Sequence, residues 1–284
     1  MDQVVRFRAL HVPGDPLVLF NIWDAGSARI LATLGFEALA TTSAGFAFSL
    51  GKPDAEGAVS RADTLANARS IVEATSLPVS ADLENGFGDD PETCAETIRL
   101  AAETGLVGGS IEDATGRADD PIYPFALSVE RVAAAVQAAR ALPFPFVLTA
   151  RAENLINGRP DLNDTIRRLE AFAAAGADVL YAPGLKSRDD IAAVVKAVAP
   201  KPVNVVMGLS GPRFSLDELA SLDVKRVSLG SSLARAAYGA FLDAAREIHD
   251  TGTFDFAARA ASYAALNDMF KRSSAETPRI EPAR

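Results

Sequence analysis

The sequence has little of what marks secreted, membrane or disulfide-bonded proteins. Cys94 is the one cysteine among 284 residues, so no disulfide can form within the chain, and this usage fits a reducing cytoplasm. No apolar run approaches the roughly 18 residues that span a membrane. The first ten residues carry charges where a signal peptide would have its apolar core. We therefore expect a cytoplasmic protein without membrane contact.

Clusters of positive charge are missing as well. The 28 Lys and Arg residues are outnumbered by 37 Asp and Glu, which gives a net charge of −9. Nucleic-acid backbones and anionic lipids attract grouped basic residues, so we expect neither as a partner. No G-x-G-x-x-G pattern follows the first predicted strand, which argues against a dinucleotide-binding fold.

What the chain does have is a regular alternation of two kinds of segment. Short runs of β-forming residues alternate with longer, Ala-rich amphipathic stretches. The predicted strands cover residues 17–22, 38–42, 78–84, 109–112, 146–150, 179–182, 202–207 and 226–229. The predicted helices cover 25–34, 61–75, 91–103, 128–141 with Ser128 as N-cap, 162–175, 187–198, 216–222, 231–250 and 254–271.

Eight strand–helix units in about 250 residues predict an α/β fold of the closed (β/α)8 TIM-barrel type rather than an open doubly wound sheet. No change of composition marks a linker. We expect a catalytic barrel over residues 1–250, an additional C-terminal helix over 251–272 and a mobile tail over 273–284.

Polar residues recur where the predicted strands end, and the active site of a parallel barrel lies at those carboxyl ends. Asp82 and Glu84 share one face after the third strand, Glu112 ends the fourth and Arg151 follows the fifth. Carboxylates at that spacing repel unless a cation or proton lies between them, and Mg²⁺ prefers such oxygen ligands. The alternative is that the acids are merely solvated, or that Arg151 forms structural ion pairs.

Other residues fit the binding of a small anion. Arg151 offers a two-pronged donor for a carboxylate or phosphonate. The backbone of Ser43, Ala44 and Gly45, at the start of a predicted loop over 43–53, could bind a second anionic oxygen. Trp23 is a candidate pocket wall. Asn204, inside the seventh strand, is either a substrate contact or a partner for backbone groups.

Several of these segments resemble the motifs of the isocitrate lyase/phosphoenolpyruvate mutase superfamily, over roughly residues 5–270. The run Asp82-Leu83-Glu84-Asn85-Gly86-Phe87-Gly88 resembles its D-x-[DE]-x-G-[FY]-G metal motif. Residues 110–113 resemble its S-I-E-D strand end, residues 51–54 its G-x-x-D segment, and residues 149–153 its A-R-x-[DE] segment.

The resemblance implies a Mg²⁺ ion, with Mn²⁺ as the alternative, held directly by Asp82, with Glu84, Glu112 and Asp54 acting mostly through water. It implies that the carboxylate of a 2-oxo acid meets the backbone of residues 43–45 and that Arg151 holds the substrate from the opposite wall. Proton donation to an enolate would fall to Tyr123 or to metal-bound water. The resemblance also implies a homo-oligomer, a dimer or tetramer, in which the helix over 254–271 is exchanged; the alternative is that this helix packs on its own barrel.

The loop after the fourth strand departs from the superfamily pattern. Residues 113–121 lack the Cys and Lys of lyases that cleave tricarboxylates, and the Lys and Asn of the phosphonate enzymes. The favoured interpretation is a Mg²⁺-dependent lyase that breaks a C–C bond of a small 2-oxo or 2-hydroxy dicarboxylate, resembling an oxaloacetate decarboxylase. Asp82, Glu112, Arg151 and Tyr123 are its catalytic candidates. The alternatives are a P–C bond enzyme and a barrel that binds carboxylates without turnover.

Overall fold

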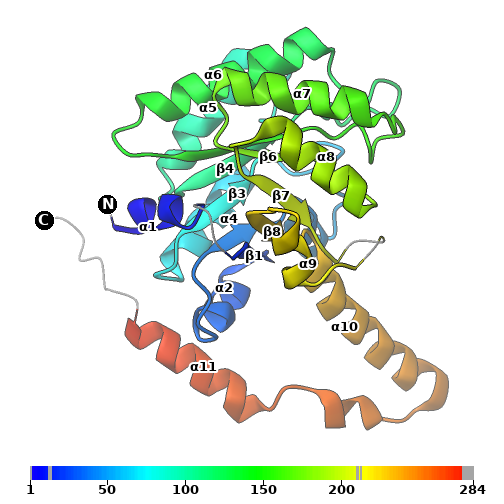
Figure 1. Cartoon of the computed structure of the whole chain (residues 1–284). Helices are drawn as coiled ribbons and strands as arrows, with labels where there is room; N and C mark the ends of the chain where they lie inside the picture. Colours follow the sequence, from blue (N-terminus) through cyan, green and yellow to red (C-terminus); the bar gives the residue numbers. More distant parts are fainter. Residues whose placement is uncertain (1, 12–14, 209–210, 212, 277–284) are drawn as a thin grey trace, which may run out of the picture.

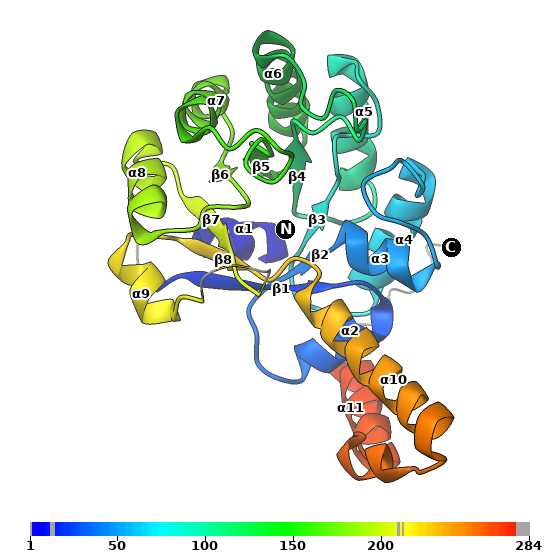
Figure 2. The same cartoon turned by 90° about the vertical axis from the view of Figure 1, so that its right-hand side faces the viewer.

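The protein folds into a closed barrel of eight parallel strands, as the alternation of segments predicts (Figures 1 and 2). The computed structural model describes residues 2–11, 15–208, 211 and 213–276. Each strand pairs with the next along the chain, and β8 closes the barrel on β1, with Val18 opposite Val227. The strands are β1 Leu17–Ile22, β2 Leu39–Thr41, β3 Val79–Asp82, β4 Gly108–Glu112, β5 Val147–Arg151, β6 Val179–Tyr181, β7 Val203–Val206 and β8 Arg226–Ser228.

Helices surround the barrel, and several begin at side chains that cap them. Ser60, Asp161 and Ser187 each accept a hydrogen bond from a backbone N–H in the first turn of the helix that follows. The helices are α1 Asp2–Ala9, α2 Ala25–Ala32, α3 Ser43–Ser49, α4 Arg61–Glu73, α5 Pro91–Ala102, α6 Phe125–Ala141, α7 Leu162–Ala175, α8 Arg188–Val198, α9 Leu216–Ser221, α10 Ser232–Thr251 and α11 Tyr263–Glu276, with a 3₁₀ turn η1 over Asp255–Arg259.

Three predictions about local structure are wrong. The expected loop over 43–53 begins with helix α3, because the Thr42 side chain accepts a hydrogen bond from the N–H of Gly45 and caps the first turn. Helix α6 begins at Phe125 after Pro124, so Ser128 lies inside the helix and is not its cap. The single helix expected over 254–271 is η1 followed by α11.

The hydrophobic core has two parts. The larger part fills the space between the outer face of the barrel and the surrounding helices, and includes Leu39, Ile71, Ile98 and Phe172. The smaller part lies at the amino ends of the strands, where helix α1, which the sequence did not predict, closes the barrel. Phe7 of α1 is fully buried there. Closure at one end leaves the carboxyl ends of the strands as the open face.

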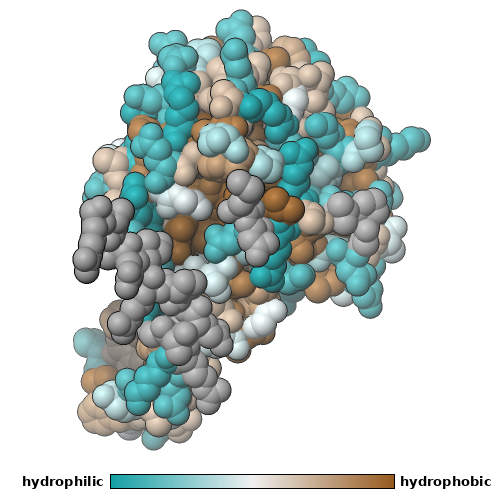
Figure 3. Space-filling model, turned by 90° about the vertical axis from the view of Figure 1, so that its left-hand side faces the viewer, coloured by the Kyte–Doolittle hydropathy of each residue, from teal (hydrophilic) through white to brown (hydrophobic). Residues whose placement is uncertain are grey.

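The C-terminal helices form an arm that extends away from the barrel. In Figures 1 and 2 helix α10 leaves the barrel, and α11 runs back toward α2. The space-filling view shows the arm as a lobe below the barrel (Figure 3). Phe241 and Tyr263 on this arm are exposed to 68% and 86%. The predicted tail overlaps α11 at residues 273–276, and residues 277–284 lie outside the described part.

Across residues 2–11, 15–208, 211 and 213–276, no helix has the length and apolar character needed to cross a membrane.

Candidate active site at the carboxyl ends of the strands

Arg151, the last residue of β5, is the centre of the polar cluster at the open face. Its Nη1 lies 3.0 Å from Asp82 Oδ1, its Nη2 3.1 Å from Glu112 Oε2, and its Nε 2.7 Å from Glu153 Oε1. The barrel register explains the meeting, because Arg151 lies beside Glu112 across β4 and β5. Burial opposes the charge of Arg151, but Glu153, Glu112 and Asp82 together hold its pKa above the usual range.

Asp82 is held from both sides. Its Oδ1 accepts the Arg151 bond and the N–H of Glu84, and its Oδ2 accepts the Ser43 hydroxyl at 3.1 Å. Its own N–H donates to the Thr41 side chain. Ser43 also lies near Asp54 and opposes the rise in the pKa of that carboxyl, so this side chain lies between the two acids. These bonds fix the orientation of the Asp82 carboxylate.

Glu84 stands on a turn that one buried arginine secures. Glu84, Gly86 and Phe87 all have positive φ angles, +49°, +80° and +63°, a conformation that is strained for the two non-glycine residues. Arg131, on helix α6 and 1% exposed, donates to the carbonyl oxygens of Asn85, Gly88 and Asp89. These bonds hold the turn in the shape that places Glu84 beside the other acids.

A second buried arginine supports the opposite wall. Arg168 of α7 donates to Asp113 Oδ2 at 2.9 Å, and Asp113 Oδ1 accepts the N–H of Glu153 at 2.7 Å. Arg168 also bonds the Tyr123 carbonyl and the Ser128 hydroxyl. This network fixes Glu153, which in turn orients Arg151.

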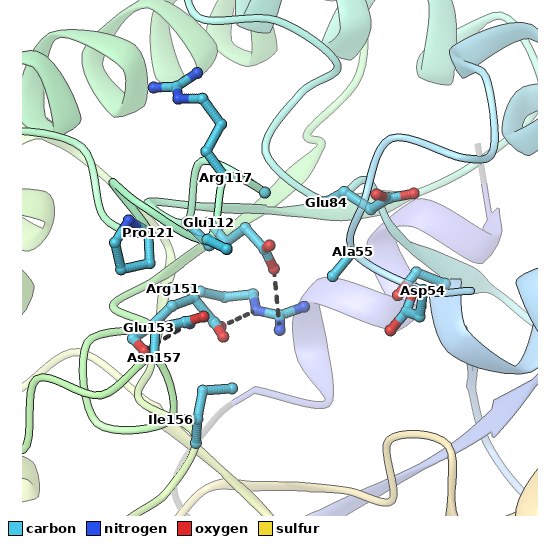
Figure 4. A pocket seen from close by; sticks show the side chains of 14 residues that line it. Asp54, Ala55, Glu84, Glu112, Arg117, Pro121, Arg151, Glu153, Ile156 and Asn157 are labelled. Carbon is cyan, nitrogen blue, oxygen red and sulfur yellow. Dashed lines mark hydrogen bonds and ion pairs between the residues drawn. The ribbon is translucent and has the colours of Figure 1, made fainter.

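A cavity of about 420 Å³ lies beside this cluster, lined by Glu84, Glu112, Arg151 and Glu153, whereas Asp82 lines a smaller cavity next to it. Figure 4 shows Asp54 and Glu84 on one side of it, Glu153 and Asn157 on the other, and Arg151 between them. Small and apolar residues complete the walls. The lining residues are Ser43, Asp54, Ala55, Glu84, Glu112, Ala114, Gly116, Arg117, Ala118, Pro121, Arg151, Glu153, Ile156 and Asn157.

The acids of the cavity are crowded and partly dehydrated. Burial and the nearby Asp82 and Asp54 raise the pKa of Glu84 to about 7. Burial and Asp82 likewise raise the pKa of Asp54, and burial raises that of Glu112 well above its usual range. Within the described part of the chain, neither Asp54 nor Glu84 forms an ion pair. The lining therefore has more acids than arginines, since Arg117 and Arg151 face Asp54, Glu84, Glu112 and Glu153, and Arg117 is paired with Asp89.

The donor set fits a hydrated divalent cation. Carboxylate oxygens are the ligands of Mg²⁺, which is usually held by one or two of them and keeps several waters. Among the described residues, no three His, Cys, Asp or Glu side chains are arranged to hold an ion directly. Asp54 and Glu84, which form no ion pair within the described part of the chain, would face such an ion, and the expectation that most of the acids act through water stays a prediction.

Other predicted site residues lie away from this cavity. Tyr123 is buried, and its hydroxyl donates to Asp89 at 2.6 Å, so it does not line the cavity. The backbone of Ala44 and Gly45 forms the first turn of α3, and the Cβ of Trp23 packs against Gly45. Asn204 lies inside the barrel, where its amide bonds Ser228 and Arg226.

The sequence interpretation missed chiefly the buried arginines that hold the site residues in place. Arg131 and Arg168 occupy the buried stripes of helices α6 and α7, among Val132, Ala135, Leu169 and Phe172. A charge on an apolar helix face indicates a buried polar contact, so this signal was available in the sequence. Ile156 and Asn157 follow no motif and had no such signal.

A (β/α)8 barrel with an arginine among carboxylates at the carboxyl ends of its strands defines a class of enzymes that bind small anionic substrates. The phosphoenolpyruvate phosphomutase family model matches residues 7–249, and the chain belongs to this family. It is thus an enzyme of the isocitrate lyase/phosphoenolpyruvate mutase superfamily of lyases and mutases, as the motifs predicted.

Three relatives show the range of the superfamily. A crystal structure from Burkholderia cenocepacia J2315, with the provisional description lyase/mutase, has a TM-score of 0.92 and 62% identity over 95% of each chain. The 2-methylisocitrate lyase of Escherichia coli is 30% identical over 81% of this chain and 79% of its own. The structure of an oxaloacetate acetylhydrolase with its product oxalate has a TM-score of 0.84 and 26% identity, over 96% of this chain and 95% of the other.

Proposed function

We propose that the protein is a Mg²⁺-dependent lyase that breaks a C–C bond of a small 2-oxo or 2-hydroxy dicarboxylate, with oxaloacetate as the favoured substrate. The observation that carries the proposal is the cavity at the open face, where Arg151 is paired with three carboxylates while Asp54 and Glu84 form no ion pair with a described side chain. Such a site suits an anionic substrate bound together with a metal.

The chain's own residues have separate tasks in this proposal. Arg151 uses three of its five N–H groups on Asp82, Glu112 and Glu153, which leaves two donors for a substrate carboxylate. Asp82 would hold the ion, with Glu84, Glu112 and Asp54 orienting its waters. When bound, Mg²⁺ supplies Lewis-acid stabilisation of the negative charge that develops on the substrate oxygen.

Tyr123 has a supporting task in this scheme. Its hydroxyl is committed to Asp89, and burial and that bond raise its pKa to about 12. Its ring lies 4.0 Å from the Arg131 guanidinium, so it packs over the arginine that secures the Glu84 turn. We assign it to positioning rather than proton transfer.

The experiment is a comparison of substrates with Mg²⁺ and with EDTA. Oxaloacetate, 2,3-dimethylmalate, 2-methylisocitrate and phosphonopyruvate are incubated with the protein and with an enzyme-free blank, which corrects for spontaneous decarboxylation. Metal-dependent pyruvate from a C–C substrate supports the proposal, and the yields of pyruvate and oxalate distinguish decarboxylation from acetyl hydrolysis. No turnover of any C–C substrate would contradict it.

The Asp82→Ala variant tests the metal assignment. We expect it to remain folded and to lose at least 100-fold in Mg²⁺-dependent rate, because the carboxylate that anchors the site is gone. Asp217→Ala, a change of an exposed aspartate on α9, is the matched control and should keep full activity. Full activity of Asp82→Ala would refute the assignment.

P–C bond chemistry is the second candidate, and the match to the phosphomutase family model favours it. Phosphate release or rearrangement of phosphonopyruvate in the same assay would select it. Thermal stabilisation by these ligands without any product would instead support a barrel that binds carboxylates without turnover.

We also propose that the arm of α10 and α11 assembles the protein into a homo-oligomer, a dimer or tetramer, in the cytoplasm. The support is the exposure of Phe241, Leu242, Phe254 and Tyr263, large side chains that a single chain leaves in water.

A further inference from the structure

The interior of the barrel contains a second, smaller cavity that shares Asp82 and Arg151 with the proposed active site. TIM-barrel interiors are usually filled by bulky branched side chains. Here Ala40, Ser80, Ser110, Asn204 and Ser228 line a space of about 80 Å³. A water molecule takes up roughly 30 Å³ of liquid, so the space holds about two or three particles of that size.

Arg226, the first residue of β8, also lines this cavity and is 95% buried, with 5% of its surface exposed. Its Nε donates to the Asn204 side chain at 2.9 Å, but its Nη1 is buried and has no hydrogen-bond partner. No carboxylate in the described part of the chain forms an ion pair with it. A buried guanidinium without a counter-charge is costly, and proteins normally compensate it.

The neighbours of Arg226 do not supply the missing negative charge. Burial and the nearby Arg226 lower the pKa of His11 to about 4, so His11 is neutral. Burial raises the pKa of Tyr181, so its hydroxyl keeps its proton. Among the described residues that line the cavity, Asp82 is the only carboxylate, and it is bonded to Arg151 and Ser43. Burial also lowers the pKa of Arg226 itself to about 10, which still leaves it charged at pH 7.

We propose that the barrel interior binds one small monovalent inorganic anion, of the size of chloride, against the Arg226 guanidinium. The hydroxyls of Ser80, Ser110 and Ser228 line the same space and can donate to it, and the remaining volume takes one or two waters. The anion compensates Arg226 and thereby secures the chain of bonds from Arg226 through Asn204 to Ser228. Ser228 hydrogen-bonds Tyr181, whose ring lies 5.1 Å from the Arg151 guanidinium.

Thermal unfolding tests this site without reference to any reaction. The full-length protein is melted in sodium chloride and in sodium gluconate at equal ionic strength, since gluconate is too large for the cavity. We expect Tm to be about 3 °C higher when chloride exceeds its Kd roughly tenfold. Arg226→Met should abolish this difference. Arg188→Met, which removes an arginine with a half-exposed side chain on α8, should keep it.

A crystal soaked in sodium bromide gives an independent readout if Arg226→Met does not fold. We expect an anomalous peak inside the barrel beside Arg226 of the wild-type protein. Density that fits water alone, together with equal Tm values in the two salts, would overturn the proposal. So would a chloride response that Arg226→Met retains. None of these readouts depends on the substrate, so the proposed function can fail while this site stands.

Discussion

Glu84 joins two unusual properties in one residue, a strained backbone and a carboxyl with a raised pKa. Its folded pKa of about 7 lies above the usual 4.5, so the folded protein binds the proton more tightly than the unfolded chain. The stability that this proton contributes is complete below about pH 4.5 and is lost as pH rises through about 7.

We therefore expect the metal-free protein in EDTA to lose stability between pH 5 and pH 8. The wild-type free energy of unfolding should fall by about 2 kcal/mol more than that of Glu84→Gln, which has no titrating group at this position. Urea denaturation at both pH values measures this. Mg²⁺ should reduce the difference, because a cation favours the ionised carboxylate. Identical pH dependence in both proteins would contradict the placement of Glu84 among the acids.

Arg131 is the residue that we expect to matter most for the shape of the Glu84 turn. Arg131→Met leaves three carbonyl oxygens without their buried donor, and we expect a loss of about 3 kcal/mol in the free energy of unfolding. Arg140→Met on the same helix is the control, because its guanidinium is 43% exposed and its ion pair should contribute less than about 1 kcal/mol. Equal losses in the two variants, measured by urea denaturation, would show that the bonds of Arg131 to the three carbonyl oxygens contribute no more stability than an exposed ion pair.

The residues of the candidate site could be predicted only in part from the sequence. Asp82, Glu112 and Arg151 stand in recognisable strand-end motifs, and the structure brings them together. Tyr123 was singled out because it lies on a loop near the site, and sequence proximity does not report side-chain direction. Its hydroxyl points to Asp89 instead.

At the scale of elements, helix α1 shows how the closed end of the barrel is stabilised. Phe7 is fully buried, and a Cβ added to Gly108 would lie 3.0 Å from its ring, so β4 has a glycine where the ring packs. The sequence pattern did not predict this helix, because eight residues of which three are charged have a weak amphipathic signal.

Truncating Phe7 tests whether α1 belongs to the folding unit. Phe7→Ala should lower the free energy of unfolding by about 3 kcal/mol, since it opens a void in the smaller core. Val5→Ala on the same helix, where the side chain is 59% exposed, should change it by less than about 0.5 kcal/mol. A single cooperative urea transition with this shift is expected. An unchanged Phe7→Ala curve would mean that α1 is not coupled to the barrel.

The element boundaries that sequence alone misplaced have a common cause. Ser, Gly and Pro read as loop formers at 43–53 and 124–128, yet Thr42 caps α3 and Pro124 precedes α6. Local propensity is weak compared with the tertiary packing of the helix that follows, so residue type alone does not fix where a helix begins.

At the scale of the whole molecule, the arm of α10 and α11 is the feature that a single chain leaves incomplete. Phe241 is 68% exposed and Leu242 47%, on a helix that leaves the barrel (Figure 1). Phe241→Glu should reduce the oligomer to smaller species, because it places a charge in the proposed apolar interface.

Size-exclusion chromatography with light scattering at several protein concentrations measures this change. Lys196→Glu, at an exposed position of α8 on the barrel, is the control for a change of charge and should leave the mass unchanged. A monomeric wild-type protein, or an unchanged mass of Phe241→Glu, would rule out this interface.

The sequence by itself determined the barrel, the order of its strands and the acids and arginine at their carboxyl ends. These follow from local periodicity and short motifs, in which each residue's neighbours along the chain carry the information. Only the tertiary structure decided which acids pair with Arg151, that the Tyr123 hydroxyl bonds Asp89, and that Arg226 Nη1 is buried without a hydrogen-bond partner. Those outcomes depend on side chains from strands far apart in sequence, and barrel closure sets their distances and their burial.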